Sequence, residues 1–270
     1  MVSVNYVADA IVRKCIPVGV RYDATKSKFF RAHPKSDSAA YACAPRNVVS
    51  EIEKNGIHIW RGYMNHQQAI DLGNAALPFL RKVQAGALAS KRTLNDKDAG
   101  LFRLRNADTE ISDTKPIFDD VRLTAIAAAV TTPNVRAHMR MVELREGIYS
   151  HCSEDCWHFD EPFKYKFKFF LLLSDVTEDN SPFSYVKRSH LGGKWRRAKE
   201  LDAFHYGYDG QWGFYHQHEY DALLKKHPEF EPIVCTGKAG DMILFDANGL
   251  HRREILRSGY RVILSNYYQA

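Results

Sequence analysis

The second half of the chain alternates apolar and polar residues with the period of two that is typical of β-strands. From residue 135 to residue 141, Val, Ala, Met and Met occupy every second position, and Arg, His and Arg lie between them. Further short runs bounded by turn residues predict strands at 166–174, 183–187, 232–235, 242–245 and 261–267. Many short strands after a helical section indicate a sandwich or jelly roll with helices packed on one sheet.

The stretch before residue 135 is mixed and mostly helical. Apolar residues at helical spacing, flanked by capping and stop signals, predict helices at 47–56, 65–83 and 118–130. Asn47 and Asn65 are expected as N-caps, the second in an Asn-x-x-Gln pattern, and Pro78 is expected to kink its helix. Residues 56–62 alternate as a strand between the first two helices. We therefore expect one structural domain with three sections, an irregular N-terminal arm (1–46), a mostly helical support (47–134) and a β core (135–270).

The composition is that of a folded, soluble protein. Hydrophobic residues make up 45% and charged residues 26% of the chain, and the longest apolar run, Phe169–Leu173, has only the length of a strand. The first residues lack the compact apolar core of a secretory signal, and Asp9 and Asp23 argue against a transit peptide. The five cysteines are odd in number and scattered, which favours reduced thiols. We expect a cytoplasmic protein that does not bind a membrane.

The net charge is +6 and the pI is near 9.0, and the basic residues are most concentrated in one segment. Residues 186–199, VKRSHLGGKWRRAK, hold six Lys and Arg residues, including Arg196 and Arg197. The segment is interpreted as a solvated loop, an anion-binding loop or a nucleic-acid surface. Since no recognised nucleic-acid motif accompanies it, we expect no nucleic-acid partner.

Candidate metal ligands lie beside the most apolar run, in CWHFDEPFKYKFKFFLLLSDV (156–176). In an extended segment His158 and Asp160 face the same way and Phe159 faces the other. The segment GDMILFDANGLH then delivers His251 after a turn. Two histidines and one carboxylate form the facial triad that leaves positions open on Fe(II). A hydrogen-bonded surface pair is the alternative for His158 and Asp160 alone.

Arg261 makes this pattern more specific. It follows His251 by ten residues on the next predicted strand, GYRVILSNYY. An arginine there can bind a carboxylate through two parallel hydrogen bonds, a geometry that lysine does not reproduce.

These two segments, CWHFDEPFKYKFKFFLLLSDVTEDNSPFSYVKRSH and GKAGDMILFDANGLHRREILRSGYRVILSNYY, resemble the phytanoyl-CoA dioxygenase family of Fe(II)- and 2-oxoglutarate-dependent oxygenases. NGIHIWRGYMNHQQAIDLG resembles that family's N-terminal strand and helix, so the resemblance runs from about residue 47 to the C-terminus. It implies a mainly β protein with flanking helices around a cupin-like double-stranded β-helix. It further implies His158, Asp160 and His251 as iron ligands, Arg261 on the distal carboxylate of 2-oxoglutarate, and O2 as co-reactant.

The resemblance implies oxidation of a small-molecule substrate, coupled to conversion of 2-oxoglutarate into succinate and CO2. Hydroxylation is the expected outcome, with desaturation, epoxidation or cyclisation as alternatives at the same site. Halogenation is disfavoured because Asp160 is present where related halogenases lack a carboxylate. Two departures put local loops in doubt, since Ser181 and Arg188 stand where the family has glycine.

Further side chains are weaker candidates. Lys168, Met139 and Ser265 are expected near the cosubstrate, although a solvent-facing lysine and core packing are the alternatives for the first two. Substrate contacts are assigned to Trp157, Phe163, Arg196, Arg197 and Trp212, with packing on the sheet as the alternative for the first. The aromatic segment 205–221 is a lid or an insertion packed outside the barrel, and His216 and His218 share a strand face that a second metal would need.

Two rival hypotheses stay open. A zinc protein would use His151, Cys152, Cys156 and His158, but this leaves Asp160, His251 and Arg261 unexplained. A binding module of the same fold without turnover is the other.

Overall fold

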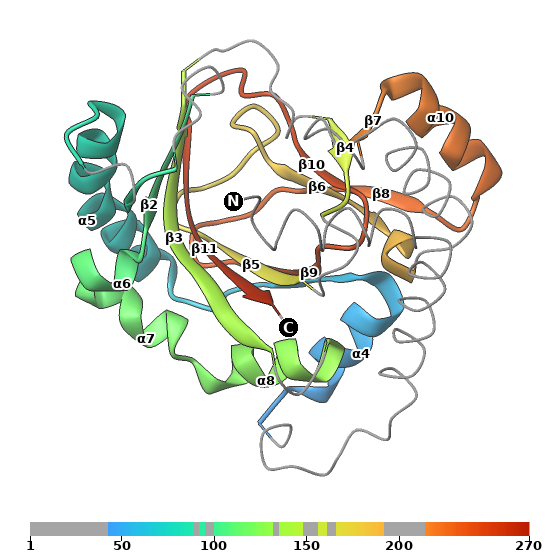
Figure 1. Cartoon of the computed structure of the whole chain (residues 1–270), viewed down its shortest axis with the longest axis horizontal. Helices are drawn as coiled ribbons and strands as arrows, with labels where there is room; N and C mark the ends of the chain where they lie inside the picture. The colour runs from blue at the N-terminus through green and yellow to red at the C-terminus, as the bar shows by residue number, and fades with distance from the viewer. Residues whose placement is uncertain are drawn as a thin grey trace, which may run out of the picture.

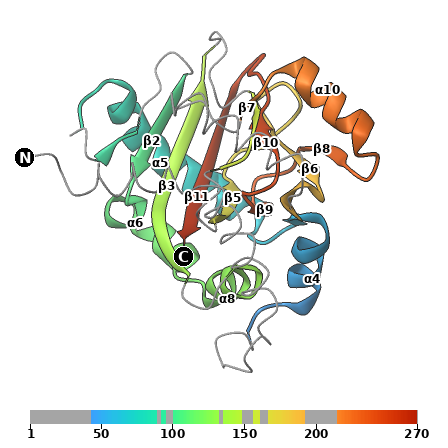
Figure 2. The same cartoon turned by 45° about the vertical axis from the view of Figure 1, so that its right-hand side comes forward.

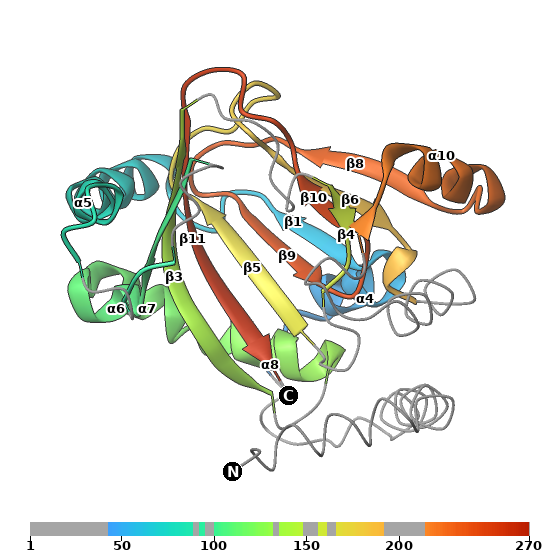
Figure 3. The ribbon, with the colours of Figure 1, turned by 45° about the horizontal axis from the view of Figure 1, so that its top comes forward.

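The computed structural model describes residues 43–88, 92–94, 100–131, 135–147, 156–160, 166–191 and 214–269. Two antiparallel sheets lie face to face, with helices outside them (Figures 1 and 3). The six-stranded sheet runs in the order β1 (Ile57–Trp60), β9 (Met242–Asp246), β5 (Lys166–Leu172), β11 (Tyr260–Gln269), β3 (Arg136–Glu146) and β2 (Leu101–Arg105). The five-stranded sheet runs in the order β7 (Phe214–Tyr215), β4 (Trp157–His158), β10 (His251–Arg253), β6 (Phe183–Lys187) and β8 (Glu231–Cys235).

Helices cover the outer face of the six-stranded sheet, and one helix lies against the smaller sheet (Figure 2). In chain order they are α4 (Arg46–Asn55), α5 (His66–Gln84), α6 (Ala107–Glu110), α7 (Lys115–Phe118), α8 (Val121–Val130) and α10 (Gln217–Lys226), with 3-10 turns η2 (Ser112–Thr114) and η4 (Ser189–Leu191). No helix in the described ranges is long and apolar enough to cross a membrane. The predicted class, mainly β with flanking helices, is confirmed.

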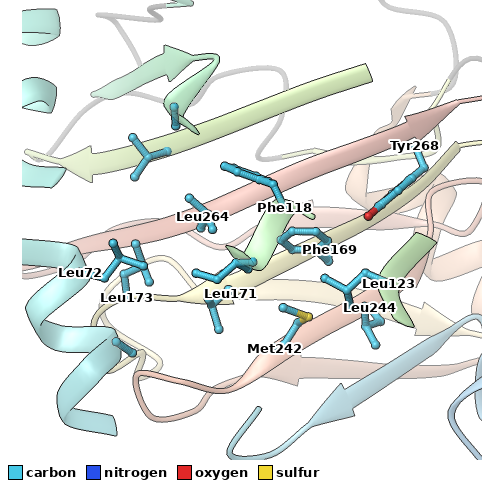
Figure 4. Close-up of a cluster of buried hydrophobic side chains, with 14 of the residues drawn as sticks. Leu72, Phe118, Leu123, Phe169, Leu171, Leu173, Met242, Leu244, Leu264 and Tyr268 are labelled. Atoms are coloured by element: carbon cyan, nitrogen blue, oxygen red, sulfur yellow. The ribbon is translucent and has the colours of Figure 1, made fainter. Parts of the chain in front are cut away.

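Alternation along the strands divides the apolar residues between two clusters. On β5, Phe167, Phe169 and Leu171 pack outward against the helices, while Phe170 and Leu172 face the space between the sheets. Figure 4 shows the outer cluster, in which residues of the strands meet residues of the helices: Phe169, Leu171, Leu173, Met242, Leu244, Leu264 and Tyr268 against Leu72, Phe118 and Leu123. The run that reads as one apolar block in the sequence is therefore buried on both faces.

Between the sheets, aromatic rings fill the barrel next to the candidate ligands. Phe183 and Phe245 have ring centroids 4.5 Å apart, and Phe170 meets Phe183 edge to face at 5.2 Å. The ring of His251 lies 5.7 Å from that of Phe183. Apolar rings thus surround one side of the site.

The helix signals were partly right. The Asn65 side chain accepts hydrogen bonds from the amides of Gln67 and Gln68, at 2.9 and 3.3 Å, as an N-cap should. Pro78 lies inside α5. The assignment of Asn47 as an N-cap is wrong, because α4 begins at Arg46 behind Pro45 and has no side-chain cap.

Strand β3 departs from the predicted alternation. Its pairing with β11 shifts by one residue, since Tyr267 lies opposite Met139 and Tyr268 lies opposite Ala137. His138 is the extra residue of this β-bulge, so Ala137 and Met139 lie on opposite faces rather than on one.

The predicted support section also supplies strands. β1 and β2 form the two edges of the six-stranded sheet, pairing with β9 and β3. The division of the chain at residue 134 stays a prediction. The N-terminal arm, apart from residues 43–46, lies outside the described residues.

Candidate active site

Three predicted ligands lie together at the meeting point of β4 and β10. His158 and His251 are direct partners across these strands, and their ring centroids are 4.4 Å apart. His251 Nε2 lies 3.6 Å from Asp160 Oδ1. One ligand atom from each of His158, Asp160 and His251 lies within 4.8 Å of the other two. Two imidazoles and one carboxylate at this spacing fit a divalent metal with open positions, as in Fe(II) oxygenases.

Backbone carbonyls orient both imidazoles. His158 Nδ1 lies 2.8 Å from the carbonyl oxygen of Cys156, and His251 Nδ1 lies 2.8 Å from that of Gly249. A ring nitrogen that donates to a carbonyl leaves the other nitrogen with its lone pair free for a metal. Both Nε2 atoms are therefore the candidate ligand atoms.

The turn between β9 and β10 places His251. The Asp246 side chain accepts from the backbone amide of Asn248 at 2.8 Å. A Cβ on Gly249 would lie 2.0 Å from the Tyr185 hydroxyl, which donates to the Asp246 carbonyl at 2.9 Å. Only glycine leaves room for this approach, so the turn can carry His251 directly into the site.

Asp160 is held by a buried cation. Lys168 Nζ lies 2.8 Å from Asp160 Oδ2, and the two side chains are 9% and 13% exposed. The ammonium also lies 4.1 Å from the centroid of the Tyr267 ring. The alternative of a solvent-facing lysine is therefore wrong. Its observed partner is the candidate ligand itself, with Oδ1 turned toward His251.

Arg261 lies deeper in the barrel, on β11. It is buried, and its Nη1 donates to the carbonyl of Ser181. Burial, and then the nearby Arg253, lower the pKa of Arg261 to about 9. Within the described residues its Nε has no hydrogen-bond partner, and neither has the hydroxyl of Ser265 on the same face of β11. Two buried donors without protein acceptors fit a bound carboxylate.

The remaining predicted residues separate into three groups. Met139 is half-buried and lies opposite Tyr267, on the face of β3 that looks into the barrel. Trp157 stacks on Tyr220 at 4.5 Å under α10, on the side away from His158, so it packs rather than lining the site. Phe163, Arg196, Arg197 and Trp212 lie outside the described residues.

The sequence analysis missed a group of buried charges. Arg103, Glu143, Arg145 and Arg253 all lie near Arg261, and each affects its pKa. A signal existed for Arg253, because it is two residues beyond His251 and shares its strand face. In the segment HRRE, a strand turns Arg253 to the same side as His251 and Arg252 to the opposite side.

Both family departures keep the backbone of a glycine. Ser181 has φ 61° and Arg188 has φ 70°, in the left-handed region that costs roughly 1 kcal/mol for such residues. The Ser181 hydroxyl donates to the Glu254 carbonyl at 2.6 Å, which offsets part of this strain. The loop shape is therefore preserved where it receives Arg261.

The described residues add no support for the other two metal sites considered, a zinc site around Cys156 and a second site at His216 and His218. His151 and Cys152 lie outside the described residues, and Cys156 is an exposed free thiol. His216 and His218 stack with ring centroids 5.8 Å apart at the start of α10, and within the described ranges the triad is the one group of three metal-binding side chains. Residues 214–221, the described part of the predicted lid, form β7 and the start of α10, and these elements pack on the smaller sheet.

Comparison with solved structures supports the fold. The protein EctD from S. alaskensis, solved with 2-oxoglutarate and 5-hydroxyectoine, matches with a TM-score of 0.63 and 16% identity over 89% of this chain and 80% of that chain. The non-heme α-ketoglutarate-dependent carbocyclase SnoK from nogalamycin biosynthesis matches with a TM-score of 0.56 and 14% identity over 83% of both chains. A search of curated protein sequences gives no significant match.

The family model named phytanoyl-CoA dioxygenase matches residues 94–258, which is more than half of the chain. That range contains the three clustered candidate ligands, Lys168 beside Asp160 and the turn that positions His251. With the double-stranded β-helix and this donor set on the same barrel, the chain belongs to the phytanoyl-CoA dioxygenase family of Fe(II)- and 2-oxoglutarate-dependent oxygenases.

Proposed function

We propose that the protein hydroxylates a small-molecule substrate, with His158, Asp160 and His251 as its Fe(II) ligands and Arg261 on the distal carboxylate of 2-oxoglutarate. The single observation that carries the proposal is the clustering of the three ligand atoms within 4.8 Å. Iron held by these three residues would supply the activation of O2, which oxidises the substrate C–H bond by two electrons while 2-oxoglutarate gives the other two electrons and is converted to succinate and CO2.

The chain's own residues prepare this chemistry. The carbonyls of Cys156 and Gly249 fix the two imidazoles, and Lys168 orients the Asp160 carboxylate. Phe183 and Phe245 border the site with apolar rings, and such a border excludes water from the reacting groups.

The substrate class rests on charge. The basic segment 186–199 supports an anionic group on the substrate, so replacing Arg196 and Arg197 by Ala is expected to raise the KM for the substrate while uncoupled 2-oxoglutarate turnover stays the same. An unchanged KM would contradict this part of the proposal. We also assign the protein to the cytoplasm, which the reduced cysteines Cys43, Cys156 and Cys235 support.

The outcome of the oxidation need not be hydroxylation. Two of the similar structures are described as a carbocyclase and an epimerase, which keeps cyclisation or another oxidative outcome as the second candidate. Product analysis by mass separates them, because hydroxylation adds one oxygen atom and ring formation removes two hydrogens.

The test is an anaerobic titration of the purified apo-protein with Fe(II) and 2-oxoglutarate. The signal monitored is the visible charge-transfer band of the chelate. We expect the band in the wild type, and no band in His251→Ala. His218→Ala is the matched control, since this histidine is exposed on α10, and it is expected to behave like the wild type. Absence of the band from all three proteins would reject the iron site, and release of CO2 from 2-oxoglutarate distinguishes an enzyme from a silent binding module.

A further inference from the structure

The two residues that precede His251, Gly249 and Leu250, lead from the turn after β9 into β10. Hydrogen bonds hold both backbone groups of Leu250. Its carbonyl accepts from the amide of Val186 at 2.9 Å, as in an ordinary strand pairing. Its amide instead donates to a side chain, the hydroxyl of Ser189, at 2.7 Å. The backbone immediately before the candidate iron ligand therefore depends on one side-chain contact.

The Ser189 hydroxyl is held in a single orientation. Ser189 is completely buried, and its hydroxyl donates to the Val186 carbonyl at 2.6 Å while it accepts from the Leu250 amide. A hydroxyl that donates in one direction and accepts in another cannot rotate freely. A buried amide without an acceptor costs free energy, so Leu250 requires this oxygen.

One peptide group connects Ser189 to His251. The N–H of Leu250 and the C=O of Gly249 belong to the same peptide unit, which is planar. Fixing the direction of the N–H therefore fixes the direction of the C=O. This carbonyl accepts from His251 Nδ1 at 2.8 Å, and the Nε2 of the same ring lies 3.6 Å from Asp160 Oδ1. The hydroxyl thus influences the imidazole orientation through a rigid group.

The same contacts form a series of hydrogen bonds that all run in one direction. His251 Nδ1 donates to the Gly249 carbonyl, the Leu250 amide donates to Ser189, and Ser189 donates to the Val186 carbonyl. Hydrogen bonds in series polarise one another, so each acceptor becomes stronger. A stronger acceptor at Nδ1 raises the basicity of the other ring nitrogen. The series therefore favours cation binding at His251 Nε2.

The turn that carries Ser189 is anchored on both sides to the last turn of α4. The Arg188 amide donates to the Asn55 carbonyl at 2.9 Å, and His190 Nε2 lies 3.1 Å from the Glu53 carbonyl. Carbonyls at the C-terminus of a helix lack partners within the helix, so they are available for these contacts. Helix α4 therefore fixes the position of the Ser189 hydroxyl.

The geometry points to Ser189 as a positioning residue for the metal centre. Through the Gly249–Leu250 peptide it orients His251 for a divalent ion, without being a ligand itself. This inference rests on the proposed function, because it requires His251 to bind the ion.

The first test is calorimetric titration of the metal-free protein with Mn(II). For Ser189→Ala we expect the Kd to rise on the order of 10-fold, the lower end of the range for partners of metal ligands. Ser189→Cys keeps a weaker donor and acceptor, so an intermediate Kd is expected. This second variant gives the answer if Ser189→Ala does not fold, and a wild-type Kd in it would then overturn the inference.

Ser184→Ala is the matched control. Ser184 is 1% exposed, and its hydroxyl donates to Glu254 Oε1 at 2.6 Å. The variant therefore loses a buried serine hydroxyl on the neighbouring strand without changing a contact of the Gly249–Leu250 peptide. Its Kd for Mn(II) should equal that of the wild type.

The second test separates orientation from general destabilisation by NMR of the Zn(II)-loaded, ¹⁵N-histidine-labelled protein. Ser189→Ala should shift the Nδ1–H signal of His251 and leave that of His158, which lies 2.8 Å from the Cys156 carbonyl, unchanged. A wild-type Kd in Ser189→Ala, an equal rise in Ser184→Ala, or equal shifts of both imidazoles overturns the inference alone. Failure of the wild type to bind Mn(II) overturns the proposed function and this inference with it.

Discussion

Replacing Lys168 by Met should make the stability of the protein depend on metal. Lys168 is a buried cation 2.8 Å from Asp160, and both side chains are nearly inaccessible. Removing one partner of a buried ion pair leaves the other charge uncompensated, at a cost of about 3–5 kcal/mol. Met fills much of the same volume, so little of the loss comes from packing.

The magnitude can be translated into a melting temperature. For a chain of this size 1 kcal/mol corresponds to ~2–4 °C, so the lower end of the cost predicts a drop of roughly 6–12 °C for the apo-protein. A divalent ion bound to Asp160 replaces the lost positive charge. Saturating Mn(II) should therefore raise the melting temperature of Lys168→Met by more than that of the wild type.

The assay is thermal unfolding monitored by circular dichroism, carried out once with a chelator and once with Mn(II). The matched control is Lys187→Met, which removes a lysine 2.7 Å from Glu231 in a pair whose side chains are 25% and 53% exposed. Exposed pairs contribute about 0–1 kcal/mol, so its melting temperature should hardly move and should not depend on metal. Equal losses in the two variants, or a Lys168→Met protein as stable as the wild type without metal, would refute the reasoning.

Three further outcomes follow from single positions. Gly249→Ala should lower metal affinity by displacing the turn, since its Cβ would meet the Tyr185 hydroxyl at 2.0 Å; isothermal titration with Mn(II) checks this, and wild-type affinity would contradict it. Cys235 should resist iodoacetamide until unfolding while Cys43 reacts at once, because burial raises the pKa of the Cys235 thiol to about 12; peptide mapping after alkylation reports both thiols. The hydrogen-bonded ion pair with Lys238 lowers the pKa of Asp175 from 3.8 to about 2. Because the folded-state pKa is lower than the unfolded-state pKa, the ionised carboxylate stabilises the fold above about pH 4, and this stabilisation is lost as the pH falls toward 2. Urea unfolding should then show a stability gap between the wild type and Asp175→Asn that closes in this interval, and a gap that stays constant would refute the assignment.

The sequence predicts the clustering of the three candidate metal ligands because their spacing is local. His158 and Asp160 share a face through the i, i+2 rule, and a glycine turn is enough to return His251 to them. The longer strands were also predictable, since β5, β6 and β11 are long enough to show a period or an apolar run. No long-range information was needed for these parts.

What the sequence does not predict depends on contacts across the barrel. β4, β7 and β10 have two or three residues each, too few to show a period, and exist because neighbouring strands pair with them. The bulge at His138 moves Ala137 to the other face, and only the pairing of β3 with β11 reveals it. The ion pair of Lys168 with Asp160 likewise depends on how β5 faces β4.

The charges inside the barrel explain why a keto dicarboxylate would bind in one direction. One end offers lone pairs, from two imidazoles and a carboxylate, and such a set attracts a cation that a keto acid can chelate. The other end is rich in donors, because four buried arginines lie there with a single glutamate and guanidinium groups accept no hydrogen bond. Low polarity around Phe183 and Phe245 strengthens both interactions. A ligand with one chelating end and one simple carboxylate would satisfy both ends only with its keto acid at the metal, so we expect the cosubstrate to lie in this orientation.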